Sequence, residues 1–195
     1  MTVDPAGQPV HPSEPLDTAQ PIEEAKRLGG VAAWLNAADL SAYRAIRSLA
    51  RWEAPVPYVR RFSKLGEHGA VWLVVGAVAS VTDRRRRARW RRATFTVGAS
   101  YLTSSSVKVA IGRRRPVVED LPQLMATPTG LSFPSSHSTS SFAAARAYSR
   151  LLPAPALYAV AVPMALSRLY LGVHYPSDIL AGAALGTVLG TLGRA

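Results

Sequence analysis

Cysteine is absent from this chain of 195 residues. Its absence excludes a disulfide framework, a thiolate metal site and thiol redox chemistry. Carboxylates are scarce as well, because only 12 Asp and Glu stand against 23 Lys and Arg. The sequence shows no cluster of carboxylates that could hold a metal ion. Chemistry that needs a thiol or a carboxylate cluster is therefore not expected.

Lysine is also rare, occurring only at Lys26, Lys64 and Lys108, so the formal net charge of +11 comes almost entirely from arginine. In a soluble protein such a charge would indicate nucleic-acid binding. Here, however, much of the arginine lies in short clusters between apolar segments, as in the loops that anchor membrane proteins. We therefore predict a membrane protein with no nucleic-acid partner.

Apolar runs are present, but the first of them is shorter than a typical membrane span. Residues 69–82 form a run of 14 residues, whereas a bilayer needs about 20, so this run must extend into flanking turns or cross a thinned bilayer. No segment has a credible strand pattern, and we predict an all-α, integral-membrane helical bundle. Five transmembrane helices are expected, at residues 69–82, 93–111, 136–152, 156–171 and 179–192.

The N-terminal part differs from the bundle in composition. Residues 1–30 are rich in proline and acidic, which predicts a disordered tail, and residues 31–195 form the predicted membrane-embedded domain. Residues 31–50 predict an amphipathic helix that lies on the membrane surface or packs on the bundle. A helix spanning residues 31–55 would instead make a sixth transmembrane helix. Residues 51–66 predict an interfacial connector.

Two of the predicted spans carry side chains suited to the interior of a bundle. The second half of residues 93–111 is rich in serine and ends near Lys108, so it should face a bundle interior or a wet cavity. Gly182, Gly186 and Gly190 form a G-x-x-x-G-x-x-x-G ladder that allows close helix contact. We predict that this ladder packs within the chain; the sequence itself sets no oligomeric state.

Arginine is most concentrated at residues 83–92, where it fills seven of ten positions. The positive-inside rule places this loop in the cytoplasm. Alternation of the spans then puts residues 112–137 and 168–178 together on the outer side. We predict a multi-pass protein of the plasma membrane whose active site, built from these two loops, is extracytoplasmic.

The first of three polar motifs runs from Lys108 to Pro116. Lys108 and Arg115 are seven residues apart, close to two helical turns, so both can reach one side if the helix persists to Pro116. A compact ammonium and a planar guanidinium together suit phosphate oxygens. A membrane anchor is the alternative. It fits Arg113 and Arg114 but suits Lys108 poorly, because Lys108 would lie inside the span.

The second motif, Ser-Phe-Pro-Ser-Ser-His-Ser at residues 132–138, opens the third predicted span. The free N–H groups at a helix N-terminus bind anions, and the hydroxyls of Ser135 and Ser136 would add donors. A bound anion would favour the protonated form of His137, which could then act as general acid for a departing alkoxide. The alternative, on this segment alone, is a serine N-cap beside a surface histidine.

The third motif, residues 167–178, places a cation, an imidazole and a carboxylate beside an apolar segment. Pro176 suits the first turn of the last predicted helix, so His174 precedes that helix and Asp178 lies in its first turn. A carboxylate four residues on can accept from one imidazole nitrogen and leave the other free as nucleophile, while Arg168 holds the anion. The alternative is a capping aspartate and an interfacial histidine.

In order, the patterns K-x6-R-P, P-S-x-H and S-R-x5-H-x3-D resemble the signature of the type 2 phosphatidic acid phosphatase superfamily. The resemblance implies a membrane phosphatase, without metal or cofactor, that hydrolyses a lipid-linked phosphate through a phosphohistidine. It also implies that His174 attacks phosphorus, that Asp178 orients it and that His137 protonates the leaving group. Phosphate binding is implied for Lys108, Arg115, Ser135, Ser136 and Arg168.

The second motif departs from the superfamily's usual P-S-G-H, because Ser136 stands where glycine is usual. We expect activity to survive, with a Cβ that crowds the phosphate or a hydroxyl that adds a donor. The fragments at residues 66–69 and 131–137 are similar to short polyprenyl-lipid phosphatases of actinobacterial envelope synthesis. The alternatives within this prediction are a phosphatase for decaprenylphosphoryl phosphoribose, a phosphatase for undecaprenyl diphosphate, and a non-catalytic membrane scaffold.

Overall fold

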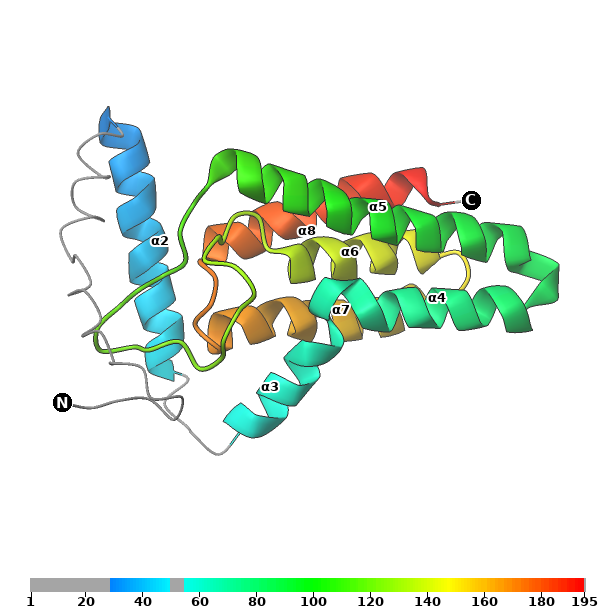
Figure 1. Ribbon diagram of the computed structural model, residues 1–195, viewed down its shortest axis with the longest axis horizontal. Helices are drawn as coiled ribbons and strands as arrows, with labels where there is room; N and C mark the ends of the chain where they lie inside the picture. Colours follow the sequence, from blue (N-terminus) through cyan, green and yellow to red (C-terminus); the bar gives the residue numbers. More distant parts are fainter. Residues whose placement is uncertain (1–28, 50–54, 195) are drawn as a thin grey trace, which may run out of the picture. The chain divides into compact units, whose positions relative to one another are not determined.

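The computed structural model describes residues 29–49 and 55–194, and in these ranges the chain is helical (Figure 1). No strand occurs in the described ranges; one isolated bridge joins Arg114 to Leu131. The all-helical prediction is therefore confirmed. The α-helices are α2 (Gly29–Leu49), α3 (Val56–Leu65), α4 (Ala70–Thr82), α5 (Arg87–Ile111), α6 (Ser136–Tyr148), α7 (Ala154–Tyr170) and α8 (Pro176–Leu192), with short 3-10 turns η1 (Glu67–Gly69) and η2 (Arg84–Arg86).

By its internal contacts the chain divides into two units, Met1–Ala38 and Asp39–Ala195. Of the first unit, the structure describes only residues 29–38, the beginning of α2. The predicted tail, residues 1–30, lies almost wholly outside the described residues and stays a prediction. The second unit holds α3 to α8 and all three polar motifs.

Helix α6 is the central helix of the second unit and contacts α4, α5, α7 and α8 (Figure 1). Its sequence explains this position, because small side chains surround the helix and let four neighbours approach. Ala143, Ala144 and Ala145 are completely buried, and Tyr148 packs with Trp90 and Trp72 in the core. The helix that carries the second motif is thus fixed on all sides.

The glycine ladder of α8 packs within the chain, as predicted, and its partner is α6. A Cβ added at Gly182 would lie 2.7 Å from the carbonyl oxygen of Ser135, and one at Gly190 would lie 2.7 Å from that of Ala143. A Cβ at Gly186 would meet the carbonyl oxygen of Thr139 at a still shorter distance. Since these neighbours are backbone atoms of a buried helix, they cannot move aside cheaply.

Replacing Gly186 with alanine is expected to lower the free energy of unfolding by roughly 2 kcal/mol, because the methyl group would push α8 off α6. Gly98→Ala on α5 is the matched control, since its Cβ would meet only Leu73, at an ordinary 3.8 Å. That variant should be neutral or stabilised by up to about 1 kcal/mol. Thermal unfolding of both purified variants in detergent tests the contrast; equal melting temperatures would contradict it.

The predicted connector at residues 51–66 contains a helix, α3, which the sequence analysis did not predict. Its prolines stand at Pro55, the N-cap, and Pro57, in the first turn. Proline is favourable at exactly these helix-start positions, where its missing N–H costs nothing. Two prolines therefore begin a helix here instead of interrupting one. Residues 51–54 lie outside the described ranges.

Helix α5 begins before the predicted span of residues 93–111 and ends where that span was predicted to end. It begins at Arg87, so several arginines of the predicted loop form its first turns. It ends at Ile111, where Gly112 takes a left-handed conformation with φ of 69° and its N–H bonds the carbonyl of Lys108. A glycine C-cap therefore stops the helix before Pro116 is reached. Arg115 consequently lies in an extended loop, not two helical turns beyond Lys108.

The span prediction is supported only in part by helix length and composition. Among the described helices, none alone is both long and apolar enough to cross a bilayer. One pair, Val56–Leu65 with Glu67–Thr82, meets these criteria together and is bent by 44°. The count of five transmembrane helices stays a prediction.

Candidate active site

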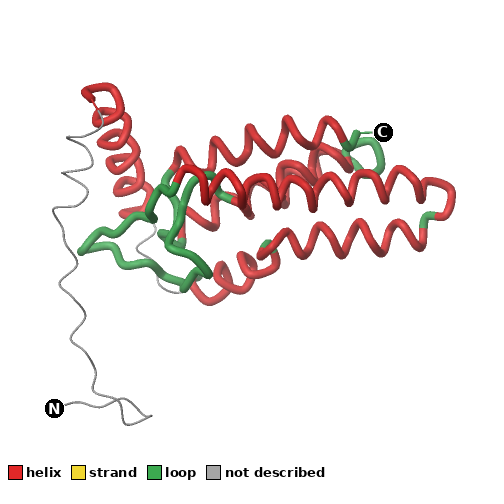
Figure 2. The backbone as a smooth tube through the Cα atoms, turned by 45° about the horizontal axis from the view of Figure 1, so that its top comes forward, coloured by secondary structure: helices red, strands yellow, loops and turns green. Residues whose placement is uncertain are grey.

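The three polar motifs meet at one end of the bundle. The long loop between α5 and α6 lies there, beside the first turn of α6 and the short connection from α7 to α8 (Figure 2). The arginine-rich turn between α4 and α5 lies at the opposite end (Figure 1). The loop between α5 and α6, which the sequence predicted to lie with residues 168–178, is therefore close to these residues in space.

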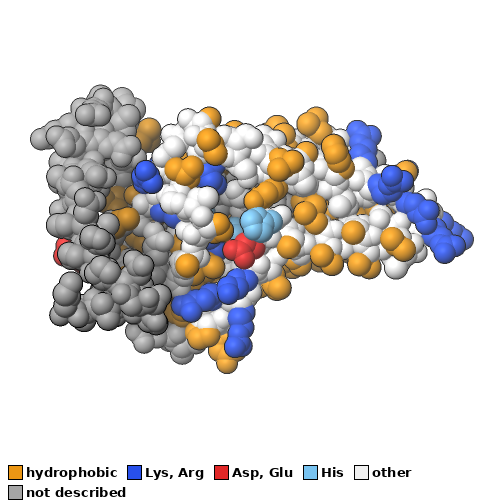
Figure 3. Space-filling model, in the orientation of Figure 1, with side chains coloured by type: hydrophobic (Ala, Val, Ile, Leu, Met, Phe, Trp, Pro, Cys, Tyr) orange, Lys and Arg blue, Asp and Glu red, His pale blue; other side chains and the backbone are white. Residues whose placement is uncertain are grey.

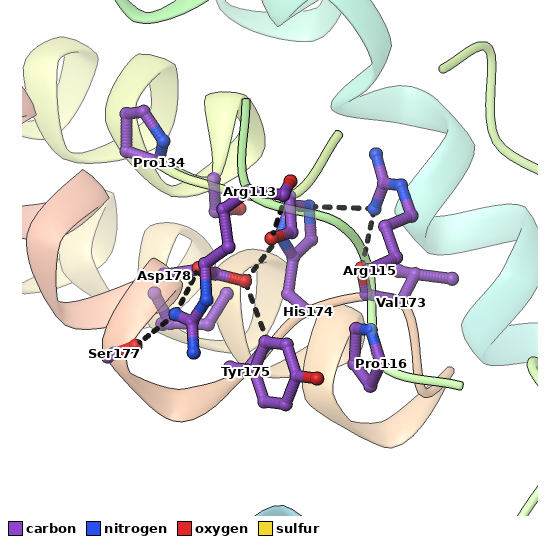
Figure 4. Close-up of polar contacts among 12 residues, drawn as sticks. Arg113, Arg115, Pro116, Pro134, Val173, His174, Tyr175, Ser177 and Asp178 are labelled. Carbon is purple, nitrogen blue, oxygen red and sulfur yellow. Dashed lines mark hydrogen bonds and ion pairs between the residues drawn. The ribbon is translucent and has the colours of Figure 1, made fainter. Parts of the chain in front are cut away.

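His174 is the centre of this cluster, only 2% exposed (Figure 4). Its Nδ1 lies 3.3 Å from Oδ2 of Asp178, whose side chain is fully buried. Because a carboxylate only accepts, Nδ1 carries the proton and the lone pair stands on Nε2. Nη1 of Arg115 lies 3.2 Å from this Nε2. An N–H donor and a nucleophilic lone pair thus face each other at one point.

The first turn of α8 fixes the orientation of Asp178. Pro176 is the first residue of the helix, as predicted, and Asp178 is its N3 residue. Oδ2 of Asp178 accepts from the backbone N–H of Tyr175 at 2.8 Å, the return half of a capping box. The same oxygen therefore caps the helix and accepts from His174. Capping and orientation, which the sequence left as alternatives, are one arrangement.

Burial lowers the pKa of His174 well below its usual value, and the nearby charges of Arg115, Arg168 and Lys108 lower it further. These effects outweigh a backbone hydrogen bond at Ser132, which raises the pKa of His174. Burial also lowers the pKa of Arg115, to about 10, which leaves its guanidinium charged at neutral pH. His174 is therefore a neutral imidazole among cations, ready to attack an electrophile held by them.

The lowered pKa predicts that His174 stays neutral when the pH falls through 6.5, the usual midpoint for histidine. Protonation should begin only at lower pH, because the cation would be buried beside three other cations. Nitrogen NMR of the histidine-labelled protein in detergent, with His174→Asn for assignment, measures this directly. The expected spectrum has a protonated Nδ1 and an unprotonated Nε2 at pH 6.5; a half-charged ring at that pH would contradict it.

Lys108 and Arg115 reach the cluster from α5 and from the loop after it. Nζ of Lys108 donates to the carbonyls of Ser132 and Pro134, both at 2.9 Å, and to that of Leu131 at 3.4 Å. An ammonium has three N–H donors, so all three are engaged with the carbonyls of residues 131–134, the segment before α6. Arg115 is held by the carbonyl of Thr129, which accepts from its Nε at 2.9 Å.

The second motif opens α6 as predicted. Ser135 is the N-cap, and its Oγ accepts from the N–H of Ser138 at 3.4 Å. The N–H groups of Ser136 and His137 stand in the first turn, where a helix leaves its donors free for an anion. Oγ of Ser136 accepts from Ser104 of α5 at 3.0 Å. The hydroxyl in the place of the usual glycine is therefore tied to α5.

His137 and Arg168 share one neighbour, Ser63 of α3. Nε2 of His137 lies 3.1 Å from the carbonyl oxygen of Ser63, and since a carbonyl only accepts, this nitrogen carries a proton. Nη1 of Arg168 donates to Oγ of Ser63 at 2.7 Å. The Ser63 carbonyl also accepts from the backbone N–H of Gly66, the C-cap of α3, at 3.0 Å, and a carbonyl oxygen has two lone pairs, so it can accept from His137 as well. Ser63 was not predicted as part of the site.

Two further residues, Arg113 and Asp39, support Asp178 and were also missed. Nη1 of Arg113 donates to Oδ1 of Asp178 at 3.0 Å (Figure 4). Its Nη2 donates to Oδ2 of Asp39 at 2.6 Å. Ser177 bonds Asp39 through its backbone N–H at 3.0 Å, and the ring of Tyr175 lies 4.1 Å from the Arg113 guanidinium. Arg113 is thus a partner of two carboxylates, where the sequence suggested a membrane anchor.

One signal in the sequence could have pointed to this support. Asp39, Tyr43 and Arg47 recur every four residues, so they share one face of α2. All three are buried: Tyr43 donates to the carbonyl of Gly172 at 3.3 Å, and Arg47 to that of Pro122 at 2.8 Å. This part of α2 is therefore packed on the site loops, one of the two arrangements that the sequence left open.

The chemistry of these side chains is that of an anion site. Three arginines and a lysine gather around two histidines. Among residues 29–49 and 55–194, no group of three His, Asp or Glu side chains is arranged to hold a metal ion. A site of this composition can bind phosphate oxygens and offer both a nucleophile and a proton donor.

A model of the PAP2 superfamily, the type 2 phosphatidic acid phosphatases, matches residues 89–194. This stretch is more than half of the chain and holds all three motifs. The chain therefore belongs to the PAP2 superfamily, and it is a phosphatase.

Two curated relatives are phosphatases with lipid-linked substrates in their names. The chain is 38% identical over 133 residues to a decaprenylphosphoryl-5-phosphoribose phosphatase of Mycobacterium tuberculosis, covering 68% of this chain and 75% of the relative. It is 39% identical over 100 residues to a lipid A 1-phosphatase of Rhizobium johnstonii, covering 47% and 41%.

The fold resembles a solved structure of the same superfamily. A transmembrane PAP2-type phosphatidylglycerolphosphate phosphatase from Bacillus subtilis superimposes with a TM-score of 0.68 at 24% identity, covering 90% of both chains. The helical bundle described above is thus an arrangement that the superfamily uses.

Proposed function

We propose that this protein hydrolyses a phosphate ester or diphosphate on a polyprenyl-type lipid through a phosphohistidine intermediate. The observation that carries the proposal is the line from Asp178 through His174 to Arg115. It holds a neutral imidazole with its lone pair toward a guanidinium. A phosphate oxygen bound by that guanidinium would bring phosphorus next to the lone pair.

The first step forms a bond between Nε2 of His174 and phosphorus and breaks the bond from phosphorus to the leaving oxygen. The negative charge of the bound phosphate would favour a second proton on His137, at Nδ1, because Nε2–H is engaged with Ser63. That proton passes to the leaving oxygen. Water then attacks phosphorus, giving its proton to His137 and releasing phosphate and free His174.

The remaining residues of the three motifs would bind and stabilise the transferred group. Arg115 and Arg168 would donate to its oxygens, with the backbone N–H groups of Ser136 and His137 at the start of α6 and the hydroxyl of Ser135. Lys108 would act mainly by its charge and by holding the segment before α6, because its donors bond carbonyls there.

A polyprenyl carrier is proposed because the relative aligned over the greater length is named for a decaprenylphosphoryl phosphoribose. That compound is the leading candidate, with undecaprenyl diphosphate as the second. Both place a phosphate at the end of a long isoprenoid, which suits a protein whose helices present many exposed apolar side chains. A non-catalytic scaffold is disfavoured, because it would not need an oriented histidine.

We also propose that the protein is embedded in the plasma membrane with its site outside. The likeness to a transmembrane phosphatase supports embedding. The arginines at the α4–α5 turn, at the end of the bundle away from the site, favour a cytoplasmic position for that end. Since the chain has no cysteine, Arg85→Cys and Glu119→Cys test this. An impermeant maleimide should label position 119 in intact cells, and position 85 only after permeabilisation; the reverse pattern would overturn the orientation.

Phosphate release by the purified full-length protein in detergent tests the function. Phosphoribosyl-decaprenol, undecaprenyl diphosphate and phosphatidic acid are compared, in EDTA and with or without vanadate. We expect fastest release from a polyprenyl substrate, full activity in EDTA and inhibition by vanadate, which mimics the phosphorus centre under attack. No release from any of the three, or loss in EDTA that added magnesium restores, would overturn the proposal.

A further inference from the structure

A cleft of about 650 Å³ opens between the end of α3 and the loop before α6. One side is lined by Arg60 and Lys64 of α3 and Glu67 of η1, and the loop side by residues 123–128. Figure 3 shows basic side chains gathered over α3 on this face of the molecule, with an acidic side chain beside them. None of these residues belongs to the three motifs.

The inner wall of the cleft is shared with the active site. Met125, which lines the cleft, has its Sδ 3.0 Å from Nη1 of Arg168. Ser63, the residue before Lys64, accepts from Arg168 through its hydroxyl and from His137 through its carbonyl. The cleft therefore adjoins the side of the site where His137 would protonate the leaving oxygen. Whatever remains attached to that oxygen would extend into the cleft.

The charges of the cleft suit an anion that carries hydroxyl groups. Arg60 and Lys64 are four residues apart, so they share one face of α3. The guanidinium of Arg60 is held on the carbonyl of Leu124, with Nε at 3.0 Å. Within the described residues, Nζ of Lys64 has no hydrogen-bond or ion-pair partner. Glu67 offsets one positive charge and, with Gln123, offers hydrogen bonds that sugar hydroxyls can use.

We infer that this cleft binds the leaving group and that Arg60 and Lys64 recognise a second phosphate on it. The inference rests on the proposed function and narrows its substrate class to lipids with two phosphates, of which one stays on the product. A phosphodiester-linked sugar phosphate and a lipid diphosphate both meet this requirement. A phosphomonoester of a neutral alcohol does not, because its leaving group would bring no charge to the two cations.

Three farnesyl substrates with one lipid tail test the inference on the full chain in detergent. Farnesyl monophosphate leaves a neutral alcohol, farnesyl diphosphate leaves a monophosphate, and farnesylphosphoryl-5-phosphoribose leaves a phosphodiester-linked ribose. We expect kcat/KM for the two-phosphate substrates to exceed that for the monophosphate by at least tenfold. Each cation that contacts a phosphate should contribute roughly tenfold.

Arg60→Gln combined with Lys64→Gln should lower kcat/KM for both two-phosphate substrates by about 30- to 100-fold and change that for farnesyl monophosphate less than threefold. Arg61→Gln is the matched control, because Arg61 lies on α3 outside the cleft lining. Glu67→Gln distinguishes the two kinds of two-phosphate substrate. A fall in kcat/KM confined to the ribose substrate assigns the cleft to sugar phosphates, and no such fall assigns it to lipid diphosphates.

Equal losses for all three substrates in the double variant, or a wild type that prefers the monophosphate, would overturn the inference while leaving the proposed function intact. Absence of hydrolysis of every substrate by the wild type would overturn the proposed function instead. Melting temperatures of the double variant and the Arg61→Gln control should agree, since the replaced side chains are exposed.

Discussion

His174→Ala is expected to lower the rate of phosphate release by at least about 10⁴-fold, the loss usual when a covalent nucleophile is removed. The imidazole is the buried group of the cluster whose lone pair faces a guanidinium. The other groups of the cluster are poor substitutes: they are arginines, a lysine, a carboxylate engaged with Arg113, and His137, whose Nε2 is engaged with the Ser63 carbonyl.

Release of phosphate and trapping of a labelled intermediate measure this loss together. Wild-type protein quenched during turnover of a ³²P substrate should carry label on a bond that is stable to base and labile to acid, as expected of phosphohistidine. The His174→Ala protein should carry none. His68→Asn is the control: His68 is exposed, and asparagine tolerates its positive φ of 54°. Substantial release or labelling by His174→Ala would contradict the mechanism.

His137→Ala should behave differently from His174→Ala when the leaving group is changed. A general acid matters most for a poor leaving group such as an alkoxide. Loss of His137 should therefore be severe for a lipid phosphate and much milder for p-nitrophenyl phosphate, whereas loss of His174 should be severe for both. Identical losses for the two substrates in both variants would remove the proposed division of roles.

Arg113→Gln is expected to lower the free energy of unfolding by about 3 kcal/mol, because it removes one partner of a buried charge cluster. Asp178 has a fully buried side chain, and Asp39 is 8% exposed. Without the guanidinium these two carboxylates would lose the charge that stabilises both. Activity should fall as well, since Asp178 would no longer be held at the orientation that serves His174.

Arg114→Gln is the control next in sequence, because Arg114 is exposed and makes no ion pair among the described residues. The free energy of unfolding and the activity of this variant should stay near the wild-type values. Arg113→Lys should rescue little, since one ammonium lacks the planar fork that reaches Asp39 and Asp178 together. The imidazole NMR signals of His174 separate positioning from stability: they should shift in Arg113→Gln at temperatures where the fold is intact. Equal behaviour of Arg113→Gln and Arg114→Gln would contradict the positioning role.

Local patterns in the sequence were the part that could be predicted. The spacing from His174 to Asp178, with Pro176 between them, describes a helix start, and the structure has that start. The glycine ladder of α8 likewise specifies close contact within the chain. The helix start depends on residues within one turn, and the ladder is a repeat within one helix, so both patterns can be recognised locally. The partner of the ladder, α6, is distant in the sequence and was not predicted.

The supporting residues could not be predicted because they depend on distant segments. Arg113 and Asp39 are 74 positions apart, and nothing near Arg113 distinguishes it from the exposed Arg114. The sequence also left open whether the helix after Lys108 persists to Pro116, and it does not, because Gly112 ends it first. Helix α3 was missed because proline ends some helices and begins others.

Substitutions at Ser63 can change only one of the two contacts that this residue makes with the active site. Its hydroxyl serves Arg168, but its contact with His137 is made by a backbone carbonyl, which every amino acid possesses. Saturation mutagenesis would therefore detect the contribution of the hydroxyl but not that of the carbonyl. For the same reason, covariation across relatives would link position 63 to Arg168 and not to His137. Only an amide-to-ester exchange between residues 63 and 64, which weakens that carbonyl as an acceptor, would reveal the other half.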